Sequence, residues 1–367
     1  PYYFNTQSSS TSNTLYIGDG TSLNGGNESG IQYVAYCWNA IPGYSAFGSY
    51  TGNGSADGPF IYTGFRPRFL ILKRTDTVGC HWRVHDSTRN TYNLVSNSLY
   101  INLTNAEYYE STQMSAFTSD GFTVNTDANA GSVTYASWNW KANGAGVSNT
   151  DGTISSTVSA SQASGFSVVT YTGTNTSGQT VGHGLGVAPS MIIVKARNSA
   201  GWLWGVYHVS VGNTKYLRLN ATDATTTDST TWQNTSPTSS VFSIGTAGHV
   251  NYNSSTTYVA YCWAEVAGFS KFGSYTGNGS ADGPFVYCGF RPRFVLIKSS
   301  SAAENWRMSD SSIAPYNVVS ARLWPNLSSA EDTTQTWIDF TSNGFKIRAT
   351  ASEVNTSRSE EHTSELQ

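Results

Sequence analysis

The stretch FGSYTGNGSADGPF covers Phe47–Phe60 and recurs letter for letter at Phe272–Phe285, an offset of 225 residues (272 − 47). The residues that follow are nearly copied as well, since YTGFRPRFLILKR begins at Tyr62 and YCGFRPRFVLIKS begins at Tyr287. Identical strings of this length predict that two parts of the chain share one local structure. The chain is therefore built from repeats.

A third and more divergent copy lies between these two, with SVVTYTGTNTSG beginning at Ser167 and GLGVAPSMIIVKA beginning at Gly184. The copies share prolines, lysines, tryptophans that follow the lysines, and tryptophans that close each unit. These landmarks are Pro67, Pro189 and Pro292; Lys73, Lys195 and Lys298; Trp82, Trp204 and Trp306; and Trp38, Trp140 and Trp263. Their spacing indicates units of about 100 residues, the usual size of a domain.

The landmarks also predict the boundaries of the units. We expect the C-terminal end of a preceding repeat at 1–42, a complete repeat at 43–142, a Gly/Ser/Thr-rich linker at 143–161, a divergent repeat at 162–266 and a truncated repeat at 267–357. The last repeat lacks an apolar closing strand, which predicts an unpaired sheet edge and the least stable unit. Residues 358–367 (RSEEHTSELQ) resemble a translated sequencing adapter and carry no functional weight.

Each unit contains short runs rich in β-branched and aromatic residues, such as FGSYTG, RFLILK and GFTVNT, separated by Gly, Asn, Asp and Ser. Such runs are typical of strands. No segment shows a sustained apolar period of 3.6 residues, which would indicate a helix. The sequence therefore predicts an all-β protein made of tandem antiparallel β-sandwiches, jelly-roll-like with an immunoglobulin-like alternative.

Composition narrows the classes of function. Charged residues make up 12% of the chain and the net charge is −3, so the basic surface of a nucleic-acid-binding protein is missing. No apolar run is long enough to cross a bilayer. The four cysteines (Cys37, Cys80, Cys262 and Cys288) lack metal-ligand spacing, and we expect buried free thiols, which are compatible with a reducing cytoplasm. We expect no cofactor and no metal.

Candidate catalytic acids are few. A glycan-cleaving enzyme needs two carboxylates on either side of one sugar bond, and the repeated acids are Asp57 and Asp282, Asp86 and Asp310, and Glu107 and Glu331. GSADGPF is a turn sequence, in which Asp bonds its own backbone, so we assign no catalytic residue. His81 and His85 would lie about 13 Å apart along a strand, too far for one zinc ion.

The repeated RPR motifs offer the one cluster of positive charge. Arg66, Arg68, Arg291 and Arg293, with the turn residues Asp57 and Asp282, are the candidate ligand-binding residues, because arginines beside a rigid proline can hold an anionic sugar or phosphate. The commoner fate of such arginines is an ion pair with a neighbouring domain or exposure to solvent. We expect the aligned tryptophans in the core, and Trp202, Trp324 and Trp337 as candidates for stacking on a sugar.

The strings FGSYTGNGSADGPFVYCGFRPRFVLIK, HGLGVAPSMIIVKARN and TTYVAYCWAEVAGFSKFGSYTGNG (Thr257–Gly279) resemble a repeated domain of unknown function in tailed bacteriophages, abundant in marine viral metagenomes. The resemblance implies a structural virion protein of the tail, assembled in the host cytoplasm with other virion proteins as partners. It implies no catalytic residues. A homotrimer is the assembly that tail fibres suggest, although the sequence contains no coiled-coil heptads.

Three functions follow as hypotheses. The first is a noncatalytic tail-fibre or virion module whose loops bind a host surface glycan or receptor, with no nucleic acid or membrane as partner. The second is a tailspike-like glycan depolymerase, which would need two carboxylates and an aromatic groove in one domain. The third is a bacterial surface adhesin built from similar repeats, in which several weak sites add avidity.

Overall fold

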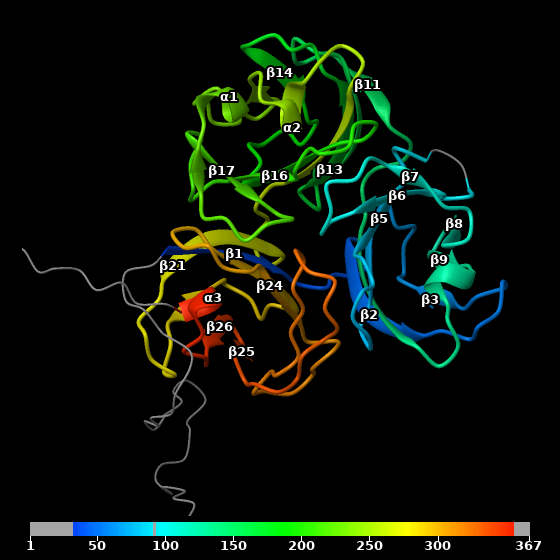
Figure 1. The fold of residues 1–367 in the computed structure, drawn as a ribbon, viewed down its shortest axis with the longest axis vertical. Helices are drawn as coiled ribbons and strands as arrows, with labels where there is room; N and C mark the ends of the chain where they lie inside the picture. Colours follow the sequence, from blue (N-terminus) through cyan, green and yellow to red (C-terminus); the bar gives the residue numbers. More distant parts are fainter. Residues whose placement is uncertain (1–31, 91–92, 356–367) are drawn as a thin grey trace, which may run out of the picture.

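The computed structural model describes residues 32–90 and 93–355, and these residues form three β-rich lobes (Figure 1). Paired strands in the lobes run antiparallel, which confirms the predicted all-β, sandwich-type class. The described residues contain no helix that is long and apolar enough to span a membrane. The adapter-like residues 358–367 and residues 1–31 of the expected repeat end lie outside the described part of the chain.

Unit 1 (43–142) is a two-layer sandwich. Its larger sheet has the order β2-β10-β4-β5-β6-β7 and its smaller sheet the order β3-β9-β8. The elements are β2 (Ser45–Thr51), β3 (Phe60–Tyr62), β4 (Phe69–Arg74), β5 (Arg83–Asp86), β6 (Asn97–Tyr100), β7 (Tyr108–Tyr109), β8 (Met114–Phe117), β9 (Gly121–Val124), the 3-10 turn η1 (Thr126–Ala128) and β10 (Thr134–Trp140). Apolar side chains such as Leu70 and Phe122 fill the space between the sheets.

Unit 2 (143–266) repeats this plan with the sheet order β11-β12-β13-β20-β15-β16-β17-β18 and a second sheet formed by the antiparallel strands β14 and β19. Its elements are β11 (Val147–Asn149), β12 (Ser156–Ser161), β13 (Phe166–Thr172), β14 (Gln179–Gly182), β15 (Met191–Ala196), β16 (Gly205–His208), β17 (Lys215–Arg218), β18 (Thr226–Thr227), α1 (Ser229–Trp232), β19 (Val241–Ile244), α2 (Gly248–Asn251) and β20 (Thr257–Trp263). The segment 143–161 is not a free linker, because β11 and β12 extend the sheet along the edge of β13.

Unit 3 takes its closing strand from the other end of the chain. β1 (Gln32–Trp38) lies between β21 (Ser270–Thr276) and β23 (Phe294–Ser299), and Tyr36 pairs with both Phe272 and Leu296. The blue β1 is visible inside the yellow-to-red lobe (Figure 1). The remaining elements are β22 (Phe285–Tyr287), β24 (Arg307–Asp310), β25 (Ile338–Thr341), β26 (Gly344–Ile347) and α3 (Ser352–Asn355).

The prediction of an open edge in the last unit is therefore wrong. β1 carries the same YVAYCW string that forms β20 in unit 2 (33–38 and 258–263), so it supplies the side chains that the missing strand would have supplied. Alternate residues of β1 serve two cores. Cys37 faces the core of unit 3, whereas Tyr36 and Trp38 face the centre of the molecule.

One aromatic core joins the three units. The closing tryptophans Trp38, Trp140 and Trp263 meet there, with ring centroids 5.8 Å (Trp38–Trp140), 6.1 Å (Trp38–Trp263) and 6.1 Å (Trp140–Trp263) apart and edge-to-face geometry. Each tryptophan comes from a different unit. Edge-to-face pairs of this kind add about 0.5–1.5 kcal/mol each beyond the burial of their surface. The units therefore form one body with pseudo-threefold symmetry, not independent beads.

The second set of aligned tryptophans ties each unit to a neighbour. Each indole N–H donates to a backbone carbonyl of another unit. The bonds run from Trp82 to Leu327 at 3.0 Å, from Trp204 to Tyr100 at 3.0 Å and from Trp306 to Arg218 at 2.8 Å. All three side chains are buried, as the sequence predicted. The same contact between units is thus made three times around the centre, which accounts for a tryptophan at this place in every unit.

The three aligned lysines are buried as well. Lys298 Nζ donates to the carbonyls of Thr222 in unit 2 and Ala302, at 3.0 and 3.3 Å. Lys195 makes the corresponding bond to Thr104 of unit 1 at 3.3 Å. Burial lowers the pKa of Lys298 to about 7 and the pKa values of Lys73 and Lys195 to about 8.

Because the pKa values of these lysines are low, we expect the free energy of unfolding to increase as the pH rises from 7 to 8.5. Over this range the unfolded chain keeps its lysines protonated while the folded chain loses protons, so the free energy of unfolding rises, by about 2 kcal/mol. The thiols of Cys37 and Cys262, whose pKa values are raised by burial, act in the opposite direction and matter mainly above about pH 8. Urea midpoints at the two pH values measure the net effect.

The Lys298→Met variant is the matched test of that pH dependence. It keeps an unbranched side chain of similar length and removes the titrating amine. We expect a clearly smaller rise in its urea midpoint between pH 7 and 8.5. An identical rise in the variant and the parent chain would show that Lys298 does not supply the effect.

Candidate functional site

Two exposed aromatic pairs stand at equivalent places in units 1 and 3. Phe60 and Tyr62 of β3 are 47% and 71% exposed, and Phe285 and Tyr287 of β22 are 47% and 64% exposed. The members of each pair are two residues apart on one strand, so they share the outer face of the small sheet. Large exposed aromatic side chains on a soluble domain commonly mark a binding surface.

Glycines hold these rings against the sheet. A Cβ atom on Gly121 would meet the Phe60 ring at 2.6 Å, and one on Gly344 would meet the Phe285 ring at 3.1 Å. Each ring therefore packs against the backbone of the neighbouring strand, β9 or β26, at a position where a side chain would push it away. The two Phe rings are thus exposed and also packed on the sheet, which lowers the entropy that they lose when a ligand binds.

In unit 3 the aromatic pair borders a groove of about 240 Å³. Residues of β21 line it as well, and the Lys271 side chain shares the face of Gly273 and Tyr275 that is turned toward the groove. Lys271 Nζ also pairs with Glu265 at 2.6 Å. The floor is formed by Ala35 and Cys37 of β1 together with Cys288. Phe285 and Tyr287 alternate with Val286 and Cys288, which face the core of unit 3, so the rings stand at the rim of this groove and not over its floor.

The same place is filled in unit 2. The strand pairings put Thr180 and Gly182 of β14 where the other units have their aromatic pair. The inserted segment covers them: the Asn149 side chain contacts Gly182, and the Ile154 N–H donates to the Thr180 carbonyl at 3.0 Å. Unit 2 therefore uses its own chain to cover the surface that units 1 and 3 leave open.

The predicted ligand residues do not gather at this groove. Arg68 and Arg293 lie at the start of β4 and β23, where their backbone N–H groups bond the carbonyls of Trp140 and Trp38 at 3.0 and 2.9 Å. Arg68 also donates to Ser87 Oγ at 3.2 Å, and burial, together with the charge of Arg66, lowers its pKa. These two arginines thus extend the hydrogen bonding of their strands toward the closing tryptophans of the units.

The other predicted ligand-binding residues lie apart from the groove, either beside the backbone or in turns. Arg291 Nη1 donates to the Phe340 carbonyl at 2.8 Å, and Arg66 is half-buried with its Nε lacking a hydrogen-bond partner. Asp57 and Asp282 occupy exposed turns as the sequence indicated, and Asp282 forms an ion pair with Lys346. Within the described residues no hydrogen bond or ion pair links an RPR arginine to Asp57 or Asp282.

The tryptophans expected to stack on a ligand serve other purposes. Trp337 is fully buried, and Trp202 packs on Tyr252 with ring centroids 5.0 Å apart. Trp324 lies beneath the Arg322 guanidinium at 5.3 Å. The sequence did contain a signal for the exposed aromatic pairs. PFIYTG and PFVYCG each place two aromatic residues at alternate positions in the closely matched repeats, and the divergent unit has neither of them.

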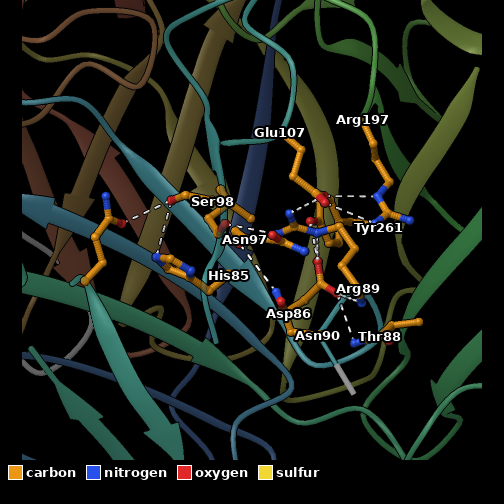
Figure 2. A network of polar contacts seen from close by, with 12 residues as sticks. His85, Asp86, Thr88, Arg89, Asn90, Asn97, Ser98, Glu107, Arg197 and Tyr261 are labelled. Atoms are coloured by element: carbon orange, nitrogen blue, oxygen red, sulfur yellow. Dashed lines mark hydrogen bonds and ion pairs between the residues drawn. The ribbon is translucent and has the colours of Figure 1, made fainter. Parts of the chain in front are cut away.

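A buried charge network lies where unit 1 meets unit 2 (Figure 2). Arg89 Nε donates to Asp86 Oδ2 at 2.5 Å and Arg89 Nη1 donates to Glu107 Oε2 at 2.8 Å. Arg197 of unit 2 binds Glu107 at 3.0 Å, and the Tyr261 hydroxyl, also of unit 2, donates to Asp86 at 2.8 Å. Two carboxylates, two guanidinium groups and a phenol thus join two units.

This charge network contains carboxylates, guanidinium groups and a phenol, which are residue types common in active sites. Its central pair, however, is buried. The side chains of Asp86 and Arg89 are fully buried and their charges are paired. Burial alone would raise the pKa of Glu107, but Arg89 and Arg197 lower it to about 2. Burial and the nearby Arg89 lower the pKa of His85 to about 3. The paired charges of Asp86, Arg89, Glu107 and Arg197 therefore join unit 1 to unit 2.

Equivalent positions in the other units make the same kind of contact. Asp310 of unit 3 accepts a hydrogen bond from Trp138 Nε1 of unit 1 at 2.9 Å, and burial raises its pKa to about 6. His208 of unit 2 packs edge to face on Tyr36 of β1, with ring centroids 4.8 Å apart. The repeated acids weighed as catalytic groups are thus partly explained as contacts between units. The described residues contain no group of three or more His, Cys, Asp or Glu side chains placed to hold a metal ion.

Comparison with known proteins gives one family. The family model described as "Domain of unknown function (DUF7483)" matches residues 2–113 and again residues 95–360. No curated protein and no solved structure matches the chain. Because the second match alone covers well over half of the sequence, the chain belongs to the DUF7483 family of domains of unknown function.

Proposed function

We propose that this chain is a noncatalytic structural module of a phage virion, located in the tail, that binds host surface glycans through its two aromatic pairs. The observation that carries the binding proposal is the repetition of one exposed Phe/Tyr pair, at Phe60 and Tyr62 and again at Phe285 and Tyr287. The virion placement rests on the resemblance of the repeats to phage tail proteins, and other virion proteins are the partners it implies.

The chemistry of the pairs suits a sugar ring. A pyranose presents C–H bonds on one face, and these carry partial positive charge that is attracted to the negative face of an aromatic ring. Its hydroxyl groups need hydrogen-bonding partners, and Lys271 lines the groove of unit 3 beside the aromatic pair. Unit 1 has Ala46 of β2 at the place of Lys271, so its surface lacks the amine.

Two features support a role in binding without catalysis. The described residues that line the groove include no carboxylate, whereas glycoside cleavage normally requires two. The chain also presents the aromatic pair twice on one rigid body, which allows both pairs to engage one polymeric glycan. Linked weak sites can raise the overall affinity by a factor of about 10²–10⁴.

The direct test is binding of the full chain to an array of bacterial surface oligosaccharides. We expect the variant Tyr62→Ala/Tyr287→Ala to lose at least about tenfold in affinity for each bound glycan, because each lost stacking contact of about 1 kcal/mol acts in both sites. Single variants measure each site separately and reveal the avidity. Reducing-end release is followed on every bound glycan.

The matched control is Tyr316→Ala, which removes another highly exposed tyrosine that lies outside the repeated pairs. Its affinity should equal that of the parent chain. Equal losses in the control and the double variant would contradict a specific site. Release of reducing ends would overturn the noncatalytic proposal in favour of a depolymerase, and failure of the folded chain to bind any glycan would leave the aromatic pairs without this role.

A further inference from the structure

Two cysteines meet beneath the groove of unit 3. Cys37 of β1 and Cys288, which directly follows β22, line the same groove and belong to the same buried cluster. Burial and the neighbouring Cys288 thiol raise the pKa of Cys37, as expected of two thiols that share one buried cluster. Both are free, as the sequence led us to expect. Yet Cys37 and Cys288 lie 251 residues apart in the chain (288 − 37).

The pairing of thiols is specific to unit 3. The position of Cys37 is taken by Asn139 in unit 1 and by Cys262 in unit 2, as the strand registers show. The position of Cys288 is taken by Thr63 and His183, whose N–H groups make the equivalent bonds to Asp120 and Ser240. Among the described residues, two cysteines therefore face each other in the one unit that is closed by a strand from a distant part of the sequence.

We propose that Cys37 and Cys288 form a disulfide under oxidising conditions, and that this bond fixes β1 covalently in the sheet of unit 3. The chain then becomes a covalently closed ring of three units. The inference is independent of glycan binding, because it concerns how the body is held together. A virion protein that leaves a reducing cytoplasm for an oxidising medium would meet the required change of conditions.

The oxidant is a small-molecule disulfide such as oxidised glutathione. The deprotonated Cys288 sulfur, reached through the groove, attacks one sulfur of the oxidant, expels one thiolate and forms a mixed disulfide. The deprotonated Cys37 sulfur then attacks the Cys288 sulfur and expels the second thiolate. Two protein thiols are oxidised, one external disulfide is reduced, and the two protons pass to the released thiolates. Burial and the neighbouring Cys288 raise the pKa of Cys37, so the second step should quicken as the pH rises.

The disulfide should stabilise the fold mainly through the unfolded state. A cross-link between residues 251 apart (288 − 37) closes a long loop and removes much of the freedom of the unfolded chain. It also prevents β1 from leaving unit 3 without unfolding of the rest. We expect the melting temperature of the oxidised chain to exceed that of the reduced chain by about 5–10 °C.

The test uses the full chain, equilibrated with oxidised or reduced glutathione and then analysed by mass spectrometry after alkylation and proteolysis. The expected product is one intramolecular disulfide that joins the peptides of Cys37 and Cys288, together with a higher melting temperature. Cys37→Ala and Cys288→Thr, the latter taking the residue type of unit 1, should each abolish both changes. Cys80→Ala and Cys262→Ala are matched controls that should retain both.

Three results would overturn the proposal. Free thiols at Cys37 and Cys288 after equilibration at pH 8.5 would show that the pair does not oxidise. A disulfide that joins other cysteines, or two chains, would show that the groove does not direct the reaction. An identical bond that leaves the melting temperature unchanged would show that it does not fix β1. Because each variant is compared in its own reduced and oxidised forms, a loss of folding in one variant is recognised at once.

Discussion

A chain that begins at residue 39, and so lacks β1, is expected to lose the folded state of unit 3. Six consecutive residues of β1, Tyr33 to Trp38, are buried, and they contact both the core of unit 3 and the central core. Burial of one large apolar side chain contributes about 1.5–3 kcal/mol. The four large ones, Tyr33, Val34, Tyr36 and Trp38, together contribute an amount comparable with the whole free energy of unfolding of a typical domain, about 5–15 kcal/mol.

The measurement is urea unfolding combined with limited proteolysis and mass spectrometry. We expect early cleavage within 267–355 and a separate first unfolding transition for this unit. The matched control begins at residue 32 and keeps the complete β1. Equal protease resistance of the two truncated chains would show that unit 3 does not depend on β1. A synthetic peptide of residues 32–38 should restore part of the resistance to the shorter chain.

The units, the strand-rich class and the buried tryptophans could be predicted from the sequence, because they depend on short patterns that repeat. RFLILK, for example, has too few polar residues for a half-exposed strand, and β4 is covered on one side by the core of unit 1 and on the other by the central core. The sequence could not show that β1 closes unit 3. Strand partners with long chain separation leave no local trace, so the final unit looked incomplete.

The candidate site was missed for a physical reason. Phe60 and Tyr62 flank Ile61, and three apolar residues in a row indicate a strand covered on both faces. Ile61 packs against the core of unit 1, whereas Phe60 and Tyr62 on the other face of β3 are 47% and 71% exposed. The positive charge of the RPR arginines favours a ligand-binding role. Charge alone, however, does not distinguish a surface binding site from the start of a strand.

The segment 143–161 shows how context overrides composition. Its Gly, Ser, Thr and Asn residues indicate a flexible linker, yet Val158 packs into the core of unit 2 and Ser156 Oγ donates to the Gly182 carbonyl at 3.0 Å. Small residues fit there because the segment lies close against β13 and β14. The same surface in units 1 and 3 is available to a ligand because those units have no such insert.

Removal of one cation from the charge network between units 1 and 2 is expected to have the second large effect. Arg89→Met replaces the guanidinium with an unbranched apolar side chain and leaves Asp86 buried without its ion pair. Breaking one side of a buried pair costs about 3–5 kcal/mol, because the remaining charge is desolvated and uncompensated. We expect a loss of this size in the free energy of unfolding, measured by urea denaturation at pH 7.

The double variant Arg89→Met/Asp86→Asn separates the cost of an orphaned charge from the loss of packing. It removes both buried charges. Its single amide oxygen can accept either from Tyr261, as Asp86 Oδ2 does at 2.8 Å, or from the Thr88 and Arg89 N–H groups, as Oδ1 does at 3.0 and 2.8 Å. We expect it to recover part of the lost stability, since replacing both members of a buried ion pair is often close to neutral. A double variant less stable than Arg89→Met would show instead that the pair is net stabilising. That result would indicate that the ion pair between Arg89 and Asp86 contributes more to the association of units 1 and 2 than the central aromatic core does.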